Sequence, residues 1–240
     1  MKQNITILGS TGSIGTNTLD VLSRHPDRFQ VFALTAAKQV DLILAQCAQF
    51  KPQFAVMANE DAGRKLADRV KAEGLPVEVL WGPAALDLVS SHPDVHAVMA
   101  AIVGAAGLEP TLAAVRSSKK VLLANKEALV TAGQLFMDAV KDHQALLLPV
   151  DSEHNAIFQC LEGHEGGSDE VRRLIVTASG GPFRTLPAEK LSEVKLEDAL
   201  KHPTWEMGQK ITIDSATLFN KGLEMIEARW LFDIPMSKVE

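Results

Sequence analysis

Short runs of apolar residues alternate with amphipathic segments through the first 150 residues of the chain. The apolar runs are continuous, which is typical of parallel strands that are covered on both faces. Strands are predicted at 4–9, 29–35, 54–57, 77–80, 96–103, 120–124 and 145–150. Helices are predicted between them at 14–24, 39–50, 60–73, 107–117 and 127–142. This alternation predicts a doubly wound, Rossmann-type parallel α/β sheet with helices on both faces.

The pattern changes after residue 150, so we predict a first domain over 1–150 and a second, α/β (α+β) domain over 151–240. The elements predicted in the second domain are a helix at 153–161, a loop at 163–170, a strand at 171–181, a helical patch near 190–201, a strand at 210–213 and a helix at 217–231. Residues 182–209 contain three prolines and few apolar residues. Such a stretch has few core contacts, which favours a mobile lid over a site.

Composition excludes several kinds of partner. The 240 residues carry a net charge of −6 and no basic block, which argues against nucleic acid or an anionic membrane as the main partner. Cys47 and Cys160 are isolated in the sequence, as expected for a protein of the reducing cytoplasm. The N-terminus lacks the apolar run of a signal peptide, and the longest stretch of small apolar residues, 98–108, is too short to span a bilayer.

The first predicted strand runs into a glycine-rich turn and then a helix. Gly9, Gly12 and Gly15 form the pattern G-x-x-G-x-x-G, a variant of the dinucleotide-binding fingerprint. Glycines allow a tight turn and a close approach of the backbone, and the N-terminus of the following helix can receive a pyrophosphate. The turn therefore predicts a dinucleotide site, with a purely structural turn as the alternative.

The residues after the second strand bear on which dinucleotide binds. An NAD site usually places an acidic residue there, for the ribose 2′-hydroxyl. No acidic residue occurs between Phe29 and Val40, whereas Lys38 offers a positive charge. This favours NADP over NAD, although a lysine at the start of a helix could simply be solvated.

Asp151 and Glu153 follow the last apolar run of the first domain. Residues two apart in an extended chain project to the same side, so the two carboxylates can reach one cation, while His154 should point to the other side. Because no cysteine or histidine cluster has zinc spacing, the expected ion is a hard one such as Mg²⁺ or Mn²⁺. The alternative is that Asp151 or Ser152 only caps the following helix.

A third carboxylate comes from the last predicted helix. Asn220, Lys221 and Glu224 share one face through their i,i+3 and i,i+4 spacing. A carboxylate beside an amide and an ammonium suits a site that holds a metal on one side and an anion on the other. Glu227, one turn further on, is the rival ligand, but we expect it to form an ordinary surface or buried ion pair.

Two further segments carry candidate binding groups. In "TASGGPFR" (177–184) Ser179 and the following glycines end a predicted strand, where backbone N–H groups could hold a phosphate. "HPTWEMG" (202–208) belongs to the proline-containing stretch. Its Trp205 is either a buried anchor or part of a lid that excludes water.

Taken together, seven ordered motifs closely resemble the 1-deoxy-D-xylulose 5-phosphate reductoisomerase family along the whole chain. They are "GSTGSIG", "AAIVGAAGL", "LLANKEALV", "PVDSEHNAIFQ", "ASGGPFR", "HPTWEMGQKITIDSAT" and "NKGLEMIEARWLF". The resemblance implies an NADPH-dependent enzyme that uses Mn²⁺, Mg²⁺ or Co²⁺ and makes 2-C-methyl-D-erythritol 4-phosphate for isoprenoid synthesis. It further implies a homodimer.

The resemblance also assigns site residues by position. It implies that the metal ligands are Asp151, Glu153 and Glu224, which with Lys126 form the catalytic group. The implied substrate contacts are Lys126, Ser152, Glu153, Ser179, His202, Ser215, Asn220, Lys221 and Glu224. The implied cofactor contacts are Thr11, Gly12, Ser13, Ile14, Ala37, Lys38, Gln39, Asn125, Glu127 and Gly208. Ala37 and Gln39 depart from the family's Gly-Lys-Asn, so the contacts to the adenosine are less well defined.

The implied reaction has two parts, a metal-assisted rearrangement of the carbon skeleton and a hydride transfer from NADPH. The sequence does not distinguish a retro-aldol path from a 1,2-shift. Members of the family continue beyond the position of Glu240, the last residue of this sequence, into a C-terminal helical domain. Two alternatives therefore stay open: a fragment that binds NADP(H) without turnover, and an NADP- and metal-dependent oxidoreductase acting on another phosphosugar.

Overall fold

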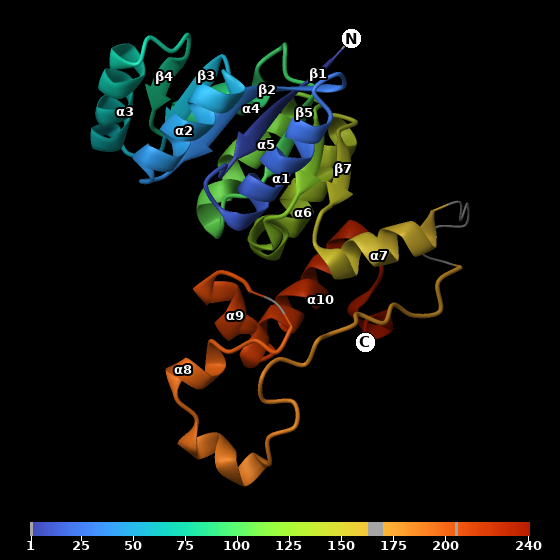
Figure 1. Ribbon diagram of the computed structural model, residues 1–240. Helices are drawn as coiled ribbons and strands as arrows, with labels where there is room; N and C mark the ends of the chain where they lie inside the picture. Colours follow the sequence, from blue (N-terminus) through green and yellow to red (C-terminus); the bar gives the residue numbers. More distant parts are fainter. Residues whose placement is uncertain (1, 163–169, 205) are drawn as a thin grey trace. The chain divides into compact units, whose positions relative to one another are not determined.

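The computed structural model describes residues 2–162, 170–204 and 206–240. The chain divides into two compact units, Met1–Val150 and Asp151–Glu240 (Figure 1). Of the loop predicted at 163–170 only Glu170 is described, and Trp205 lies outside the described residues as well.

The first unit is built on a seven-stranded parallel sheet with the order β4-β3-β2-β1-β5-β6-β7. Its strands are β1 (Gln3–Leu8), β2 (Phe29–Ala36), β3 (Phe54–Met57), β4 (Glu78–Trp81), β5 (Ala97–Ala100), β6 (Lys120–Leu123) and β7 (Leu146–Pro149). The prediction of a doubly wound parallel sheet is confirmed. The strand order reverses direction between β1 and β5, and this reversal point is where such sheets bind dinucleotides.

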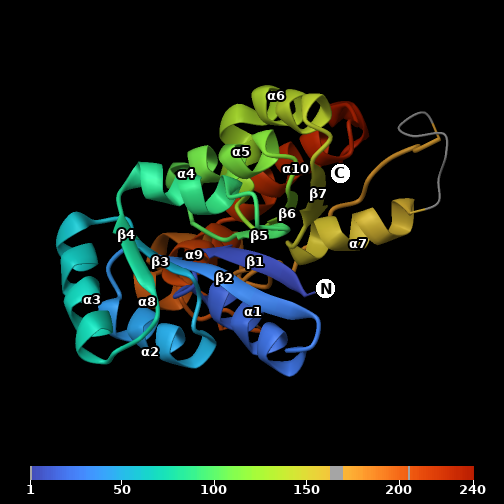
Figure 2. The ribbon, with the colours of Figure 1, turned by 90° about the horizontal axis from the view of Figure 1, so that it is seen from above.

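Helices cover both faces of this sheet. They are α1 (Ser13–Arg24), α2 (Val40–Phe50), α3 (Glu60–Ala72), α4 (Pro83–Ser91), η1 (Ala105–Gly107), α5 (Leu108–Arg116) and α6 (Lys126–Asp142). Figure 2 shows α1, α2 and α3 on one face and α4, α5 and α6 on the other. Because both faces are covered, inner-strand residues such as Ile7, Leu34 and Val98 are fully buried, which explains the continuous apolar runs.

The helix α4 is absent from the sequence prediction. It is short, begins with Pro83 in its first turn and buries only Leu86, Val89 and Ser90. A proline suits the first turn of a helix, because the N–H group that it lacks would have no partner within the helix there. A helix of nine residues with so few buried positions has only a weak helical periodicity of apolar residues, which the sequence alone does not reveal.

The described part of the second unit is mainly helical, with α7 (Ser152–Leu161), η3 (Ala188–Glu193), α8 (Leu196–Ala199), α9 (Gln209–Ala216), α10 (Phe219–Leu231) and η4 (Met236–Lys238). Its apolar core joins α7 to α10 through Ile157 and Ala228, and also contains Leu174, Val176 and Ile234. Among the described residues of either unit, no helix is both long and apolar enough to cross a membrane.

Two strand predictions in this unit are wrong. Residues 210–213 lie in the helix α9, and of the strand predicted at 171–181 the structure contains only an isolated parallel bridge between Leu174 and Val239. Backbone hydrogen bonds extend this bridge, since Leu174 N–H donates to Lys238 O at 2.7 Å and Val176 N–H to Glu240 O at 2.7 Å.

Candidate functional site

The glycine-rich turn connects β1 to α1, and two of its glycines are required by space or backbone conformation. Gly9 has φ +84°, and a Cβ there would lie 2.8 Å from the carbonyl oxygen of Ala101. A Cβ on Gly15 would lie 2.5 Å from Ser10 Cα. Gly12 differs, because its Cβ would meet nothing closer than Gly9 O at 3.6 Å. Space therefore remains beside Gly12, at the start of α1.

Buried hydrogen bonds hold the turn against β2 and α2. Gly9 N–H donates to Thr35 Oγ1 at 2.8 Å, and Ser10 N–H donates to Thr35 O at 2.8 Å. The buried Ser10 hydroxyl donates to Gln46 Oε1 at 2.7 Å, and Gln46 Nε2 donates back to Ser10 O at 2.9 Å. These bonds fix the turn on the side that faces β2 and α2. Gly12, the N-cap of α1, receives no hydrogen bond from a capping side chain. An uncapped helix N-terminus of this kind is suited to an anion.

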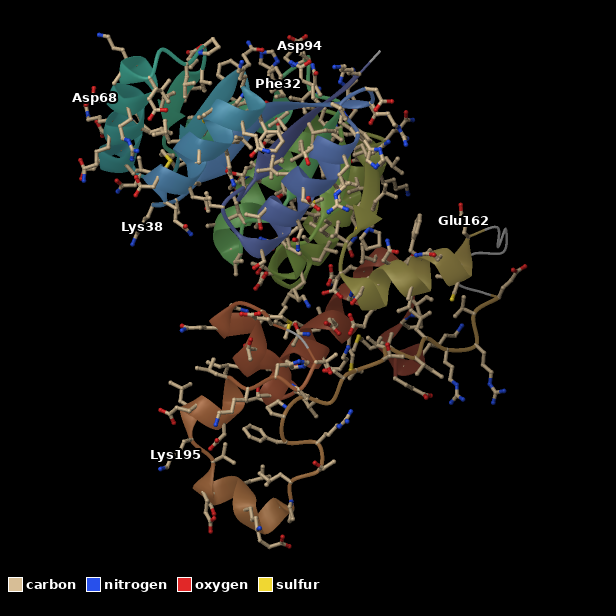
Figure 3. The ribbon with its side chains drawn as sticks, viewed as in Figure 1. Phe32, Lys38, Asp68, Asp94, Glu162 and Lys195 are labelled. Carbon is tan, nitrogen blue, oxygen red and sulfur yellow. The ribbon has the colours of Figure 1, made fainter. Side chains whose placement is uncertain are left out.

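The other predicted cofactor residues of this region lie at the same edge of the sheet. Ser13 and Ile14 are exposed in the first turn of α1, and Thr11 is half-buried. Ala37, Lys38 and Gln39 follow β2 and are all exposed. Because β1 and β2 are parallel neighbours, the residues that follow them lie at one edge. Lys38 points outward into solvent (Figure 3), where a negatively charged group can approach it.

Asn125, predicted to lie on the nicotinamide side, has a structural role of its own. It is buried and caps α6, since its Oδ1 accepts the N–H of Ala128 at 2.8 Å. Its Nδ2 donates to the carbonyl oxygens of Ile102 and, at 2.9 Å, Gly104. Glu127 is half-buried and Lys126 is buried, both in the first turn of α6.

In the second unit, carboxylate oxygens of Asp151, Glu153 and Glu224 lie within 4.8 Å of one another. Asp151 also caps α7, because its Oδ1 accepts the N–H of Glu153 at 3.4 Å. The two interpretations of the acid pair are therefore compatible: Asp151 caps a helix and still converges with the other carboxylates. The convergence arises from the first turn of α7, and not from the extended chain assumed in the prediction.

Positive charge is supplied to this group by Lys221. Its ammonium donates to Glu224 Oε2 and to the carbonyl of Thr177, and it lies 3.6 Å from Glu153 Oε1. Asn220 Nδ2 donates to Glu224 Oε1 at 2.6 Å. Glu224 is only 1% exposed, so its carboxylate needs these donors in place of water. The carboxylates offer hard oxygen atoms, and this set of ligands fits a divalent ion such as Mg²⁺ or Mn²⁺.

The prediction that His154 points away from the carboxylates is wrong. It is fully buried, with Nδ1 3.6 Å from Asp151 Oδ1 and 3.5 Å from Glu227 Oε2. The error arises because α7 starts at Ser152, so residues 151 and 154 share one helical face. Burial lowers the pKa of His154, but Asp151, Glu227 and the Glu224 carbonyl outweigh it, so that this pKa is raised.

A small cavity of about 30 Å³ adjoins the carboxylates. Its lining consists of Glu153, Ala178, Ser179, Gly180, Ser215, Leu218, Asn220 and Lys221. The structure thus brings together five of the predicted phosphate and substrate contacts, Glu153, Ser179, Ser215, Asn220 and Lys221. Ser152 is exposed beside them, and its hydroxyl donates to Glu153 Oε2 at 2.7 Å.

His202 and Gly208 belong to the predicted lid. His202 Nε2 lies 3.0 Å from the hydroxyl of Ser179, which joins the lid to the cavity lining. Gly208 is exposed and forms the N-cap of α9. From Pro182 to Gly208 the described side chains are exposed or half-buried, and none of them is fully buried.

These observations define a class of protein: a Rossmann-type dinucleotide-binding fold followed by a unit with a carboxylate cluster beside a polar cavity. The family models narrow this class. Residues 5–133 match the model for 1-deoxy-D-xylulose 5-phosphate reductoisomerase, and residues 147–232 match the model for its C-terminal domain. The chain belongs to the 1-deoxy-D-xylulose 5-phosphate reductoisomerase family.

Similar proteins and solved structures agree with this family membership. The chain is 58% identical over 237 residues to the 1-deoxy-D-xylulose 5-phosphate reductoisomerase of Ralstonia nicotianae, which covers 98% of this chain and 60% of that protein. A DOX-P reductoisomerase crystallised with NADPH, fosmidomycin and magnesium has a TM-score of 0.94 at 44% identity, over 99% of this chain and 60% of that one. The structure of the Zymomonas mobilis enzyme with NADPH has a TM-score of 0.90 at 48% identity, over 100% of this chain and 61% of that one. The chain thus spans about 60% of the length of these relatives.

Proposed function

We propose that this chain catalyses the conversion of 1-deoxy-D-xylulose 5-phosphate to 2-C-methyl-D-erythritol 4-phosphate, which depends on NADPH and a metal ion. This reaction is a step of non-mevalonate isoprenoid synthesis. The observation that carries the proposal is the convergence of Asp151, Glu153 and Glu224 next to a cavity lined by hydroxyl, amide and ammonium groups. Membership of the reductoisomerase family supports it.

The metal would be held by Asp151, Glu153 and Glu224, and when bound it would supply Lewis-acid chemistry to the oxygens of the ketose. Mg²⁺, Mn²⁺ and Co²⁺ all suit carboxylate ligands, and a relative in the same family binds magnesium. Glu153 is only partly buried, with a side chain 23% exposed, so it could also exchange a proton with a substrate hydroxyl.

NADPH would lie over the glycine-rich turn, with its pyrophosphate at the N-terminus of α1 beside Gly12 and its 2′-phosphate near Lys38. Residues Thr11, Ser13, Ile14, Ala37 and Gln39 would line this end. Asn125, Glu127 and Gly208 are proposed contacts further along the cofactor. Replacing Lys38 by Ala should remove the preference for NADPH over NADH, as measured by fluorescence titration with both cofactors.

The phosphosugar would bind through Ser152, Ser179, Ser215, Asn220 and Lys221, with His202 and Lys126 as further contacts. The cationic Lys221 and the neutral donors around it are suited to a phosphate group. We further propose a lid over residues 182–209, a cytoplasmic location and a homodimer. The isolated cysteines support the location, and the family resemblance supports the dimer.

The decisive experiment is a turnover assay on this chain with 1-deoxy-D-xylulose 5-phosphate, NADPH and Mn²⁺. We expect NADPH oxidation that requires both the sugar phosphate and the metal. Binding of NADPH without any turnover would leave a dinucleotide-binding fragment. Turnover of another phosphosugar in preference to this one would favour a different oxidoreductase.

The metal ligands are tested separately by Mn²⁺ affinity with NADPH present. Asp151→Asn, Glu153→Gln and Glu224→Gln should each lose most of the affinity, because each removes one of three carboxylate ligands. Glu227→Gln is the matched control and should keep it, since Glu227 is not among the three proposed ligands. Parent-like Mn²⁺ binding by Glu224→Gln would overturn the three-carboxylate site.

A further inference from the structure

One imidazole ring lies between the two helices that bear the carboxylates. His154, on α7, is fully buried, and its Nε2 lies 2.9 Å from the backbone carbonyl oxygen of Glu224 on α10. A carbonyl oxygen can only accept a hydrogen bond, so Nε2 carries the proton and donates it. The other ring nitrogen, Nδ1, faces Asp151 Oδ1 at 3.6 Å and Glu227 Oε2 at 3.5 Å.

This arrangement ties together residues from both helices. Asp151 stands at the N-cap of α7 and Glu224 in the first half of α10, so their spacing depends on how these helices pack. His154 contacts both of them, Asp151 through Nδ1 and the backbone of Glu224 through Nε2. Its ring also stacks on Phe232, with 11° between the planes and centroids 6.4 Å apart.

Glu227 fixes the ring from the α10 side. It lies three residues after Glu224, on the same helical face, and is 1% exposed. A glutamate this deeply buried is expensive unless charge or hydrogen bonds compensate it, and His154 Nδ1 faces its carboxylate. The ring is therefore hydrogen-bonded at Nε2 to the α10 backbone, and its Nδ1 lies 3.5–3.6 Å from carboxylate oxygens of both helices.

We propose that His154, held by Glu227, is a positioning residue that sets the distance between Asp151 and Glu224 and so preorganises the three-carboxylate metal site. The inference rests on the proposed function. Outer partners that orient ligands in this way typically contribute 10–100-fold to metal affinity. Neither residue would touch the metal or the substrate, so both would act through Asp151 and Glu224.

A competing interpretation comes from the same atoms. Among the described residues, Asp151, His154 and Glu227 form a second group close enough to hold an ion. Asp151 belongs to both groups, and His154 and Glu227 lie almost wholly out of reach of solvent. The stoichiometry of metal binding separates the two interpretations, since positioning predicts one ion per chain and a second site predicts two.

The test replaces His154 by residues that keep one half of its contacts. In His154→Gln the side-chain amide nitrogen can reach the position of Nε2 and still donate to Glu224 O. In His154→Asn it can reach only the position of Nδ1. We expect Mn²⁺ affinity, measured by electron paramagnetic resonance of the unbound ion, to fall 10–100-fold for Asn and less than about fivefold for Gln. Ile157→Val, in the same apolar core, is the control for packing and should leave the affinity unchanged.

A second set of variants in the same experiment replaces Glu227. Glu227→Gln keeps an oxygen facing Nδ1 and should bind Mn²⁺ as the parent does, whereas Glu227→Leu should match the loss of His154→Asn. The double variant, His154→Asn with Glu227→Leu, should lose no more Mn²⁺ affinity than either single variant, because both substitutions remove the same positioning interaction. Additive losses, parent-like affinity in His154→Asn, or two ions bound per chain would each overturn the proposal.

A readout without metal keeps this inference separate from the proposed function. In the metal-free protein, His154→Asn should speed amide hydrogen exchange in the α10 turn that follows Glu224, while Ile157→Val should alter the two helices equally. If the parent bound no Mn²⁺ but this local effect appeared, the metal site would fail and the positioning of α10 by His154 would stand. An unchanged exchange pattern in His154→Asn would overturn the positioning itself.

Discussion

Gly12 and Gly15 lie three residues apart in one turn, yet substitution should affect them differently. Gly15→Ala should destabilise the first unit, because its Cβ would lie 2.5 Å from Ser10 Cα and the backbone there is held by buried hydrogen bonds. Gly12→Ala should fold normally, because its nearest neighbour would lie at 3.6 Å.

The same Gly12→Ala variant should bind NADPH poorly, since the new methyl group occupies the space proposed for the pyrophosphate. Urea denaturation and NADPH titration of the two variants check this pair of outcomes. A Gly12→Ala protein that binds NADPH as tightly as the parent would place the pyrophosphate elsewhere.

The two cysteines should differ sharply in reactivity. Cys47 is fully buried, and burial raises its pKa to about 12, whereas Cys160 is exposed. A pKa raised this far leaves about one thiolate in ten thousand at pH 8. The folded protein should therefore react with one equivalent of a disulfide reagent, and with a second only after unfolding. Two equivalents reacting at the same rate in the folded protein would contradict the burial of Cys47.

At the residue scale, the sequence predicted the carboxylates and the Asn220 and Lys221 side chains beside Glu224, but it misplaced His154. Asp151, Glu153 and Glu224 stand out because acids next to apolar runs are conspicuous. An extended chain would place His154 on the side opposite the carboxylates, whereas α7 already begins at Ser152. Asp151 as an N-cap with His154 three residues later was the signal that could have revealed it.

At the scale of helices, α10 presents Lys221 to the carboxylates. The ammonium donates to Glu224 and lies 3.6 Å from Glu153 Oε1, so we expect it to compete with a divalent ion for these oxygens. Lys221→Met should therefore strengthen Mn²⁺ binding roughly tenfold without substrate, which is about 1.4 kcal/mol for a charge-assisted hydrogen bond that no longer competes. Calorimetric titration measures this directly.

The control is Lys210→Met, which removes a lysine paired with Asp214 at 2.7 Å on α9. It should leave Mn²⁺ affinity unchanged. Lys221→Met should at the same time weaken phosphate binding, because the displaced ammonium is the proposed phosphate contact. Weaker Mn²⁺ binding in Lys221→Met would mean that Lys221 supports the metal site and does not compete with it.

The helix α9 shows why an element can be mispredicted. Ile211 and Ile213 alternate with polar residues, which is the period of a strand. In the structure the buried positions are Thr212 and Ala216, four residues apart on one helical face. A polar threonine, whose hydroxyl donates to Gly208 O at 2.9 Å, takes an inward position and hides the helical period.

At the scale of the whole chain, the first unit was far more predictable than the second. Its inner strands are rich in buried apolar residues, because helices cover both faces of the sheet, and all seven strands agree with the prediction. The second unit has a smaller core and long exposed stretches, so its sequence gives little periodicity to interpret. The fold of the first unit follows from pattern, whereas the second had to be inferred from its chemical groups.

Asp151 both caps α7 and converges with the carboxylates, so a metal ion bound at the proposed site would become a term in the folding equilibrium of the second unit. By mass action, an ion that binds only the folded unit adds about 2.7 kcal/mol to its unfolding free energy at one hundred times its dissociation constant. Mn²⁺ should raise the melting temperature of the second unit, and a chelator should reverse the rise. Asp151→Asn should abolish the shift, and an undiminished shift in that variant would show that the stabilising ion binds elsewhere. The supply of divalent metal would then set how much of this unit is folded, as well as whether it is active.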